Sequence, residues 1–228
     1  MLYIVGTPIG NLFDLSLRQA ETLISADLVL AEDTRSAQTL LSKAPALFKL
    51  QSRVDQKIIS YYKENEFEKL PEILEILRLN KSVVLISESG MPLISDPGYL
   101  LLKEVIKQGL AYTVIPGPTA LVTALVHSGF KSKSFMFLSF LPKKESELKQ
   151  IIEKIIKVNK LDKKTVFIFY ESPKRINKTL TLLDQNVPEA EVVICREITK
   201  KFEEIARGKP KELLERNYKG EITVILKI

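Results

Sequence analysis

The sequence of 228 residues contains no tryptophan, one cysteine and one histidine. A single thiol, Cys195, excludes an intramolecular disulfide, and we expect a reducing, cytoplasmic location. One Cys and one His supply too few ligands for a typical zinc site, so no metal is expected. A Ser-His-Asp triad would depend on His127, which lies in an apolar helical stretch, and the sequence does not favour this chemistry.

Glycine is also scarce, and the nine glycines never form a Gly-x-Gly pattern. This excludes the dinucleotide-binding Rossmann fingerprint and the glycine-rich first loop of ordinary Rossmann methyltransferases. The chain has no GxxxxGK phosphate loop and no HExxH, CxxC or GxSxG motif. No hydrophobic run reaches the length that crosses a bilayer, and the N-terminus does not resemble a signal peptide, so we expect no membrane contact.

Basic residues are what the chain has in excess, with 34 Lys and Arg against 28 Asp and Glu and a formal net charge of +6. Eight lysines fall between Lys143 and Lys164. Such a run indicates either a polyanionic partner such as nucleic acid or simply the solvated face of a helix. The charge pattern alone favours the solvated face.

The first half of the chain alternates short hydrophobic runs with segments of helical periodicity. Strands followed by helices in this order predict a parallel five-stranded sheet with right-handed crossovers. The segment from Ala44 to Asp55, which contains Pro45, is expected to be irregular. A helix is expected to start after Ser16, a candidate N-cap. The expected strands are residues 2–5, 27–31, 57–60, 82–87 and 111–115.

The rhythm changes in the second half, where strands are separated by fewer helices. This pattern predicts a second α/β domain with a mixed sheet, so the fold class is α/β with two domains, 1–115 and 116–228. A short helix is expected at 210–217. The expected strands are residues 134–139, 165–169, 191–195, 203–207 and 221–226.

Stiff loops of small residues follow most of these strands. In the stretch from Leu85 to Tyr99, a hydrophobic strand runs into a loop with two Gly and two Pro before a helix begins. Because the loops that follow parallel strands emerge at the same edge of a sheet, we expect several of them to converge there. Such an edge suits a small ligand that is recognised by backbone groups.

Eight motifs occur in the order found in one family: GTPIGNLFDLSLR (6–18), AEDTR (31–35), SYYKENE (60–66), ISESGMPLISDPGY (86–99), IPGPTAL (115–121), FYESPKRI (169–176), REITKKFEEIARG (196–208) and KGE (219–221). The chain resembles the tetrapyrrole-methylase-like S-adenosylmethionine methyltransferases over nearly its whole length. It is most similar to their bacterial branch of small-subunit rRNA (cytidine-2′-O)-methyltransferases.

The resemblance implies a tetrapyrrole-methylase fold, with S-adenosylmethionine bound in the cleft between two α/β domains, and a homodimer. It implies methyl transfer to the ribose 2′-oxygen of a decoding-site cytidine in 16S rRNA of the small ribosomal subunit. The residues that the resemblance assigns to the donor are Pro8, Ile9, Gly90, Met91, Pro92, Ile94, Thr119, Ala120, Tyr170, Arg196, Gly220 and Glu221.

A ribose hydroxyl is a poor nucleophile, so a base is expected beside it. The candidates are Glu32, Asp33, Glu171 and Glu197, each of which could instead be a structural carboxylate, and Asp33 in particular could cap a helix. Candidate RNA-binding residues, by charge or by stacking on a base, are Arg35, Tyr62 and Arg175, with Arg196, Tyr61 and Tyr170 as further possibilities.

The chain departs from the family pattern in its central loop, where members usually carry Asp-Ala-Gly-Thr-Pro in place of Glu88 to Pro92. Met91 thus replaces a hydroxyl near the donor, and many ribosomal members also carry a further C-terminal helical segment. Two other functions stay open: a methyltransferase of the same fold that acts on a small, tetrapyrrole-like molecule, and a catalytically weak donor- and RNA-binding protein. The basic charge and the AEDTR, FYESP and REITK strings favour RNA.

Overall fold

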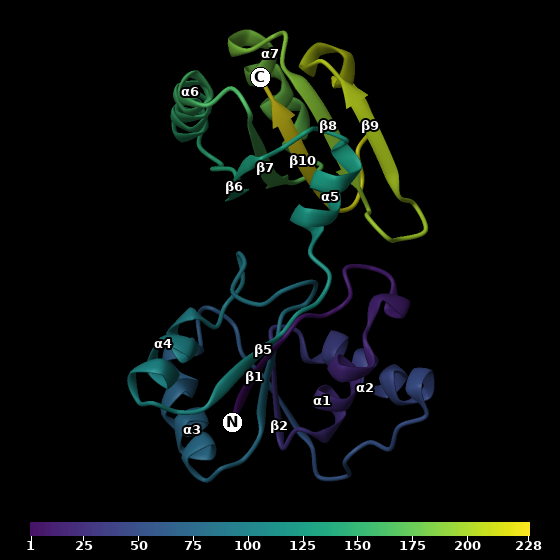
Figure 1. Cartoon of the computed structure of the whole chain (residues 1–228), viewed down its shortest axis with the longest axis vertical. Helices are drawn as coiled ribbons and strands as arrows, with labels where there is room; N and C mark the ends of the chain where they lie inside the picture. Colours follow the sequence, from purple (N-terminus) through teal and green to yellow (C-terminus); the bar gives the residue numbers. More distant parts are fainter. The chain divides into compact units, whose positions relative to one another are not determined.

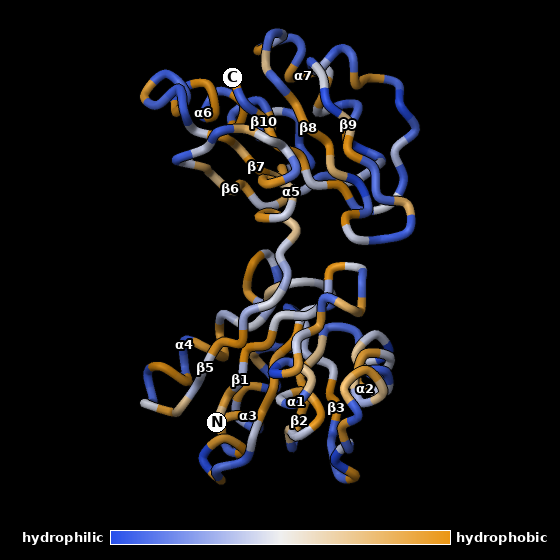
Figure 2. The backbone as a smooth tube through the Cα atoms, turned by 45° about the vertical axis from the view of Figure 1, so that its right-hand side comes forward, coloured by the Kyte–Doolittle hydropathy of each residue, from blue (hydrophilic) through white to orange (hydrophobic).

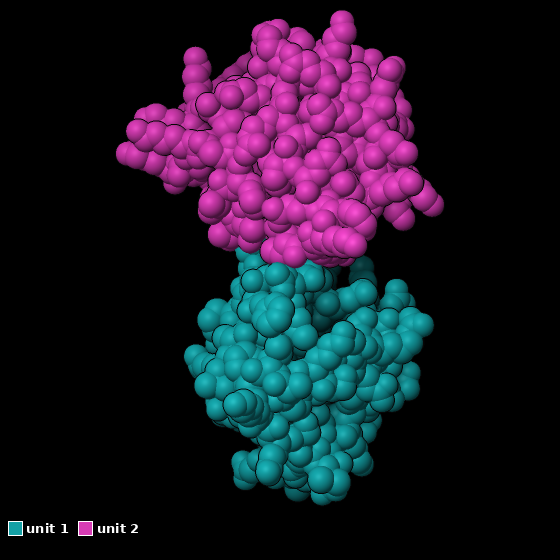
Figure 3. Space-filling model, turned by 90° about the vertical axis from the view of Figure 1, so that its right-hand side faces the viewer, with its two compact units in different colours: residues 1–119 teal, residues 120–228 magenta.

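The computed structural model describes residues 1–228, and the chain divides into two compact units, Met1–Thr119 and Ala120–Ile228. Figure 1 shows the elements of both units, and Figure 3 colours unit 1 teal and unit 2 magenta. The division falls after Thr119, whereas the sequence places it after residue 115. None of the helices combines the length and the apolar character needed to cross a bilayer.

Unit 1 is built around a parallel sheet of five strands in the order β3-β2-β4-β1-β5, which confirms the predicted architecture. β2 and β4 consist entirely of buried residues, as expected for strands covered on both faces. Figure 2 shows hydrophobic colour along β1 and β5 of the same sheet. The strands are β1 (Leu2–Val5), β2 (Leu28–Ala31), β3 (Lys57–Ser60), β4 (Val83–Ile86) and β5 (Tyr112–Ile115).

Two pairs of helices cover the two faces of this sheet (Figure 1). One cluster of buried side chains joins α1 (Leu17–Ser25) and α2 (Thr34–Phe48) to one face, and a second cluster joins α3 (Glu66–Arg78) and α4 (Tyr99–Lys107) to the other. The predicted cap Ser16 is confirmed: its side chain accepts from Gln19 N, and Gln19 Oε1 accepts from Ser16 N at 2.6 Å.

The expectation of irregular structure is wrong for Ala44 to Phe48, because α2 continues through Pro45 to Phe48, whereas residues 49–55 form no helix or strand, as expected. Leu41 and Ala44 are buried in the core at helical spacing, and this burial outweighs the one backbone hydrogen bond that a proline removes. The helix ends where Lys49 adopts a left-handed conformation with φ of 54°.

Unit 2 contains a mixed five-stranded sheet in the order β6-β7-β10-β8-β9, which confirms the second predicted sheet. β6 and β7 are parallel, and the other neighbours are antiparallel. The strands are β6 (Ser134–Phe140), β7 (Thr165–Glu171), β8 (Glu191–Arg196), β9 (Glu204–Gly208) and β10 (Ile222–Lys227).

The helices of unit 2 pack on both sides of this sheet. α6 (Glu145–Leu161) and α7 (Ile176–Asn186) share a buried cluster with strand residues such as Ile194. The next residue, Cys195, points to the opposite face, where its Sγ lies 4.0 Å from Ala124 O of α5 (Ala120–Ser128). The helix predicted at 210–217 is a shorter 3-10 helix at Pro210–Leu213.

Candidate active site

The carboxyl ends of the strands in unit 1 bring the predicted site loops to one edge. The register pairs Val5 with Ile115, and Ala31 with both Ile86 and Ser60, so all five strands end together. As expected for the ligand-binding edge of a parallel sheet, the loops that follow them contain every unit-1 residue predicted for the site except Arg35, which lies in the first turn of α2. Unit 1 therefore presents these residues side by side.

The loops after β1, β4 and β5 are in direct contact. Thr7 N donates to Gly90 O at 2.8 Å, and a Cβ placed on Gly6 would lie 2.7 Å from Gly117 Cα. Gly90 has a φ of 85°, and a Cβ there would lie 3.4 Å from Ile9 Cγ2 and 3.5 Å from Pro118 O. Only glycine adopts this backbone without strain, so Gly90 lets three predicted donor-binding segments meet.

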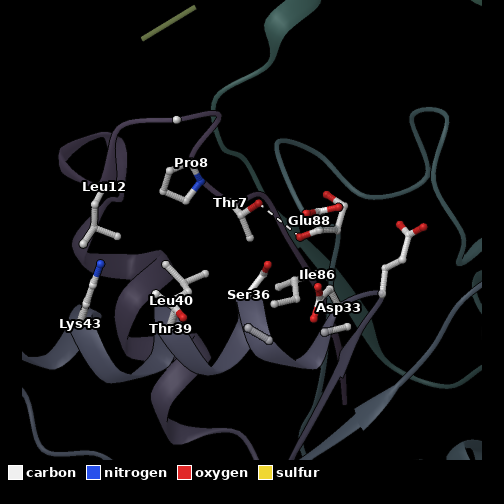
Figure 4. A pocket seen from close by; sticks show the side chains of 15 residues that line it. Thr7, Pro8, Leu12, Asp33, Ser36, Thr39, Leu40, Lys43, Ile86 and Glu88 are labelled. Atoms are coloured by element: carbon white, nitrogen blue, oxygen red, sulfur yellow. Dashed lines mark hydrogen bonds between the residues drawn. The ribbon is translucent and has the colours of Figure 1, made fainter. Parts of the chain in front are cut away.

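A pocket of about 210 Å³ opens at the same edge (Figure 4). Its walls come from the loop after β1, from the first turns of α2 and from the end of β4. Figure 4 shows Asp33 and Glu88 at one end of the pocket and Lys43 at the other. The pocket thus has an acidic end and a basic end.

Glu32 is the predicted base that stays unengaged. It is exposed, it lines the pocket, and its carboxylate makes neither a hydrogen bond nor an ion pair. Partial burial, together with the charges of Glu88 and Glu64, raises the pKa of Glu32. A carboxylate that holds its proton more tightly is a better acceptor for a hydroxyl proton.

Asp96, which follows β4 in the central loop, belongs to the same acidic group. Burial raises its pKa to about 6, and the charge of Glu32 contributes further, while a hydrogen bond with the side chain of Ser87 opposes the shift. Ser87 and Glu88 both line the pocket. Asp96 therefore interacts with two acids and a serine that line the pocket, although it does not itself line the pocket.

Asp33, the second candidate base, is engaged in local structure. It is the N-cap of α2, accepting from Arg35 N at 2.8 Å, and it pairs with Arg35 Nη2 at 2.9 Å. These hydrogen bonds from Arg35 lower the pKa of Asp33 to about 2. A carboxylate with this pKa is a weak base. The Arg35 side chain itself is 90% exposed.

Unit 2 gathers its predicted residues at one end of its own sheet. The register pairs Ile222 with both Glu171 and Arg196, so the turn Gly220–Glu221 lies beside the ends of β7 and β8. Tyr170, next to Glu171, contacts the rings of Phe137 and Phe140 at centroid distances of 5.0 and 5.3 Å.

The two predicted carboxylates of this end have structural partners. Glu171 is buried and accepts from Thr179 Oγ1 at 2.8 Å and from Ser172 N at 2.8 Å, and it pairs with Arg175 Nη2 at 2.6 Å. Arg175, a predicted RNA ligand, also donates to Leu141 O at 2.9 Å. Glu171 and Arg175 thus both have their partners within unit 2.

Glu197 stabilises the turn that precedes β10. It accepts from Glu221 N at 2.8 Å and pairs with Lys200 at 3.2 Å, and the first of these lowers its pKa most. Its carboxylate packs on Gly220, where any Cβ would clash with it. Arg196 donates to Glu204 Oε2 at 2.9 Å and to Lys219 O at 3.3 Å. These contacts hold the predicted unit-2 donor residues in place.

One suggested stacking residue is wrong. Tyr61 is completely buried and its hydroxyl donates to Glu66 Oε1 at 3.2 Å, so its ring cannot stack on a ligand. The reason is that β3 delivers Tyr61 into the core beneath α3, while the next residue, Tyr62, is 39% exposed.

The sequence prediction missed Ser36, Thr39 and Lys43, which line the pocket from α2, and the acids Glu88 and Asp96. The α2 residues recur every three or four positions, which is the spacing of one helix face, so the sequence carried that signal. The acids were hidden because their proximity to Glu32 depends on the pairing of β2 with β4.

Comparison with known proteins assigns the family. The family model for Tetrapyrrole (Corrin/Porphyrin) Methylases matches residues 1–214. The chain belongs to this methylase family. It is therefore a methyltransferase, and the family expected from the eight motifs is confirmed.

Curated relatives in the family are similar over almost the whole chain. Ribosomal RNA small subunit methyltransferase I of Thermotoga maritima is 39% identical over 229 residues, covering 99% of this chain and 97% of that protein. The protein of the same name from Halalkalibacterium halodurans is also 39% identical, and the match covers 99% of this chain and 75% of the relative.

Solved structures of family members share the fold at low sequence identity. Diphthine synthase matches with a TM-score of 0.71 at 15% identity, covering 99% of this chain and 89% of that one. Uroporphyrin-III C-methyl transferase from Thermus thermophilus, complexed with S-adenyl homocysteine, matches with a TM-score of 0.66 at 18% identity, covering 99% and 96%. These likenesses confirm the tetrapyrrole methylase fold.

Proposed function

We propose that this methyltransferase transfers a methyl group from S-adenosylmethionine to the ribose 2′-oxygen of a decoding-site cytidine in 16S rRNA of the small ribosomal subunit. The observation that carries the proposal is the 39% identity, over 99% of the chain, to a relative named as a small-subunit rRNA methyltransferase. The basic net charge of +6 agrees with an RNA substrate.

The loops of unit 1 fit the methyl donor. Gly90 leaves open the space that a side chain would fill between Ile9 and Pro118, so a small ligand could approach the backbone there. We assign donor contacts to these loops of unit 1, and in unit 2 to Tyr170, Arg196 and the turn Gly220–Glu221. The donor supplies an already activated methyl group, so the protein has only to align the acceptor and exclude water.

Glu32 is the base that the geometry supports best. Its carboxylate is free to accept the proton of a ribose hydroxyl, whereas Asp33, Glu171 and Glu197 already accept hydrogen bonds within the fold. At the other end of the pocket, Lys43 is placed to contact a phosphate of the same RNA strand.

Two other functions compete with this one. The fold also serves methyltransferases whose names refer to tetrapyrroles, but the uroporphyrin-III methyltransferase structures are only 16% and 18% identical and support the fold alone. A catalytically weak binding protein would keep the donor loops but not the free carboxylate. The proposed homodimer can be checked by sedimentation of the purified chain.

The deciding experiment is transfer of labelled methyl from S-adenosylmethionine to small ribosomal subunits that lack the modification, beside naked 16S rRNA and a reaction without protein. We expect label on a ribose 2′-oxygen of the subunit. Donor binding, measured separately by calorimetry, distinguishes the alternatives: donor binding without transfer to RNA would contradict the proposal and direct attention to small acceptors.

A further inference from the structure

The lysine-rich segment from Lys143 to Lys164 ends directly before β7, beside the start of β6. β6 and β7 run parallel, with Ser134 beside Thr165, and Ser134 Oγ donates to Asp162 Oδ2 at 2.6 Å. Asp162 also accepts from Thr165 Oγ1 at 3.0 Å and from Lys164 N at 3.0 Å. These bonds hold the segment before β6 against the segment before β7.

Both segments carry exposed lysines that form no ion pair, although the charge of Lys164 acts on Asp162. None of these lysines takes part in an ion pair, and Asp162, the acid between them, is already occupied by the three hydrogen bonds above. Glu191 at the start of β8 is paired with Lys227. We call this group the lysine surface, and its members are Lys131, Lys133, Lys160, Lys163 and Lys164.

The two halves of α6 differ in how their lysines are paired. At its start, Lys144 pairs with Glu147, and Lys149 pairs with Glu145. Its second half adds the exposed Lys154 and Lys157, neither of which has an ion-pair partner. Positive charge therefore stays uncompensated where the helix approaches the lysine surface, and crowded like charges cost free energy unless an anion binds them.

We propose that the lysine surface binds the phosphate backbone of the RNA substrate, as a contact separate from the site of methyl transfer. This inference rests on the proposed function. The lysine surface lies at the amino end of β7 and Tyr170 at its carboxyl end, and a strand of seven residues spans about 20 Å. Lysines at that distance hold a large folded RNA without touching the reacting atoms.

The test compares two triple variants of the full-length chain. Lys133→Gln, Lys163→Gln and Lys164→Gln together remove three charges from the lysine surface. Lys57→Gln, Lys81→Gln and Lys103→Gln remove the same number of charges from exposed positions of unit 1 that have no ion pair, as a matched control. Since no side-chain contact is lost, we expect both variants to match the wild type in thermal unfolding.

Methyl transfer is measured on small ribosomal subunits and on a short RNA fragment that carries only the target nucleotide and its neighbours. With subunits, we expect the lysine-surface variant to raise KM roughly tenfold with kcat unchanged, and to lower the slope of log KM against log salt by about 2, while the control behaves as wild type. With the short fragment, which does not reach the lysine surface, both variants should equal the wild type.

The outcomes separate this inference from the proposed function. If the wild type methylates subunits but the lysine-surface variant and the control have the same KM and salt slope, the lysine surface is not an RNA contact and the function stands. An equal rise in KM for the short fragment would place these lysines at the reaction site and also overturn the inference. Absence of methyl transfer by the wild type would contradict both this inference and the proposed function.

Discussion

The two sheet edges that carry the predicted site residues differ in how their glutamates are paired. At the edge of unit 1, Glu32 and Glu88 make no hydrogen bond or ion pair, and their charges add to burial in raising the pKa of Asp96. At the edge of unit 2, Glu171 and Glu197 are each held by a backbone N–H and a cationic side chain. A glutamate at the end of a strand is therefore free to react in unit 1 and has a structural role in unit 2.

The difference shows which of the two edges carries uncompensated negative charge at the cost of stability. Acids that repel one another destabilise the folded state, and such groups concentrate where a protein binds or reacts. In unit 2, Glu171 and Glu197 contribute to folding, which supports a role in positioning loops. The following changes test this contrast, from the largest expected effect to the smallest.

Glu171→Ala should strongly destabilise unit 2. It leaves Arg175 and Thr179 without their partner in a buried site, and breaking a buried ion pair typically costs about 3 to 5 kcal/mol in the free energy of unfolding. Urea unfolding followed by circular dichroism measures the effect. Thr179→Val, which removes one hydrogen bond, serves as the milder control, and an unchanged midpoint for Glu171→Ala would show that the pair is not structural.

Glu32→Gln should reduce methyl transfer by about 100-fold or more while leaving the unfolding midpoint equal or higher. The amide keeps the shape but cannot accept a proton, and general-base catalysis typically contributes a factor of about 100 to 10,000. Steady-state transfer to small subunits measures the loss. Glu88→Gln, which removes a neighbouring charge from the same pocket, is the matched control; equal losses for both would indicate a general electrostatic role.

Asp96→Asn should make stability less dependent on pH. The pKa of Asp96 is raised from its ordinary 3.8 to about 6, so the folded state binds this proton more tightly than the unfolded state. The wild type therefore loses stability as the pH rises from about 4 to about 6, and the amide removes that loss. Relative to the wild type, the urea midpoint of the variant should be higher at pH 7 than at pH 4. A difference between variant and wild type that is the same at both pH values would contradict this.

Asp33→Ala should lower the unfolding midpoint slightly, by less than Glu171→Ala, because it removes the cap of α2 and an exposed ion pair with Arg35. Asp33→Asn, whose side chain still caps a helix, should restore the midpoint and most of the activity. Methyl transfer by Asp33→Asn as low as that of Glu32→Gln would instead identify Asp33 as a second reacting group.

Much of the fold followed from local pattern. β4 is an unbroken run of aliphatic residues, and Ser16 and Gln19 form a capping box. The alternation of strands with helices in the first half allows few topologies. The error at α2 came from Pro45, whose local preference is overruled by the burial of Ala44. Local rules fail where tertiary burial contributes more free energy than the local preference.

The sequence by itself determined the two sheets, the family and which loops could meet a ligand, because these depend on hydrophobic period and on the order of motifs. Only the tertiary structure decided which acids are free. Glu32 and Glu171 look alike along the chain, and they differ because Arg175 and Thr179 reach Glu171 from the turn and helix after β7, whereas Glu32 faces other carboxylates across β2 and β4. Ionisation depends on neighbours in space, and those are set by strand pairing and helix packing.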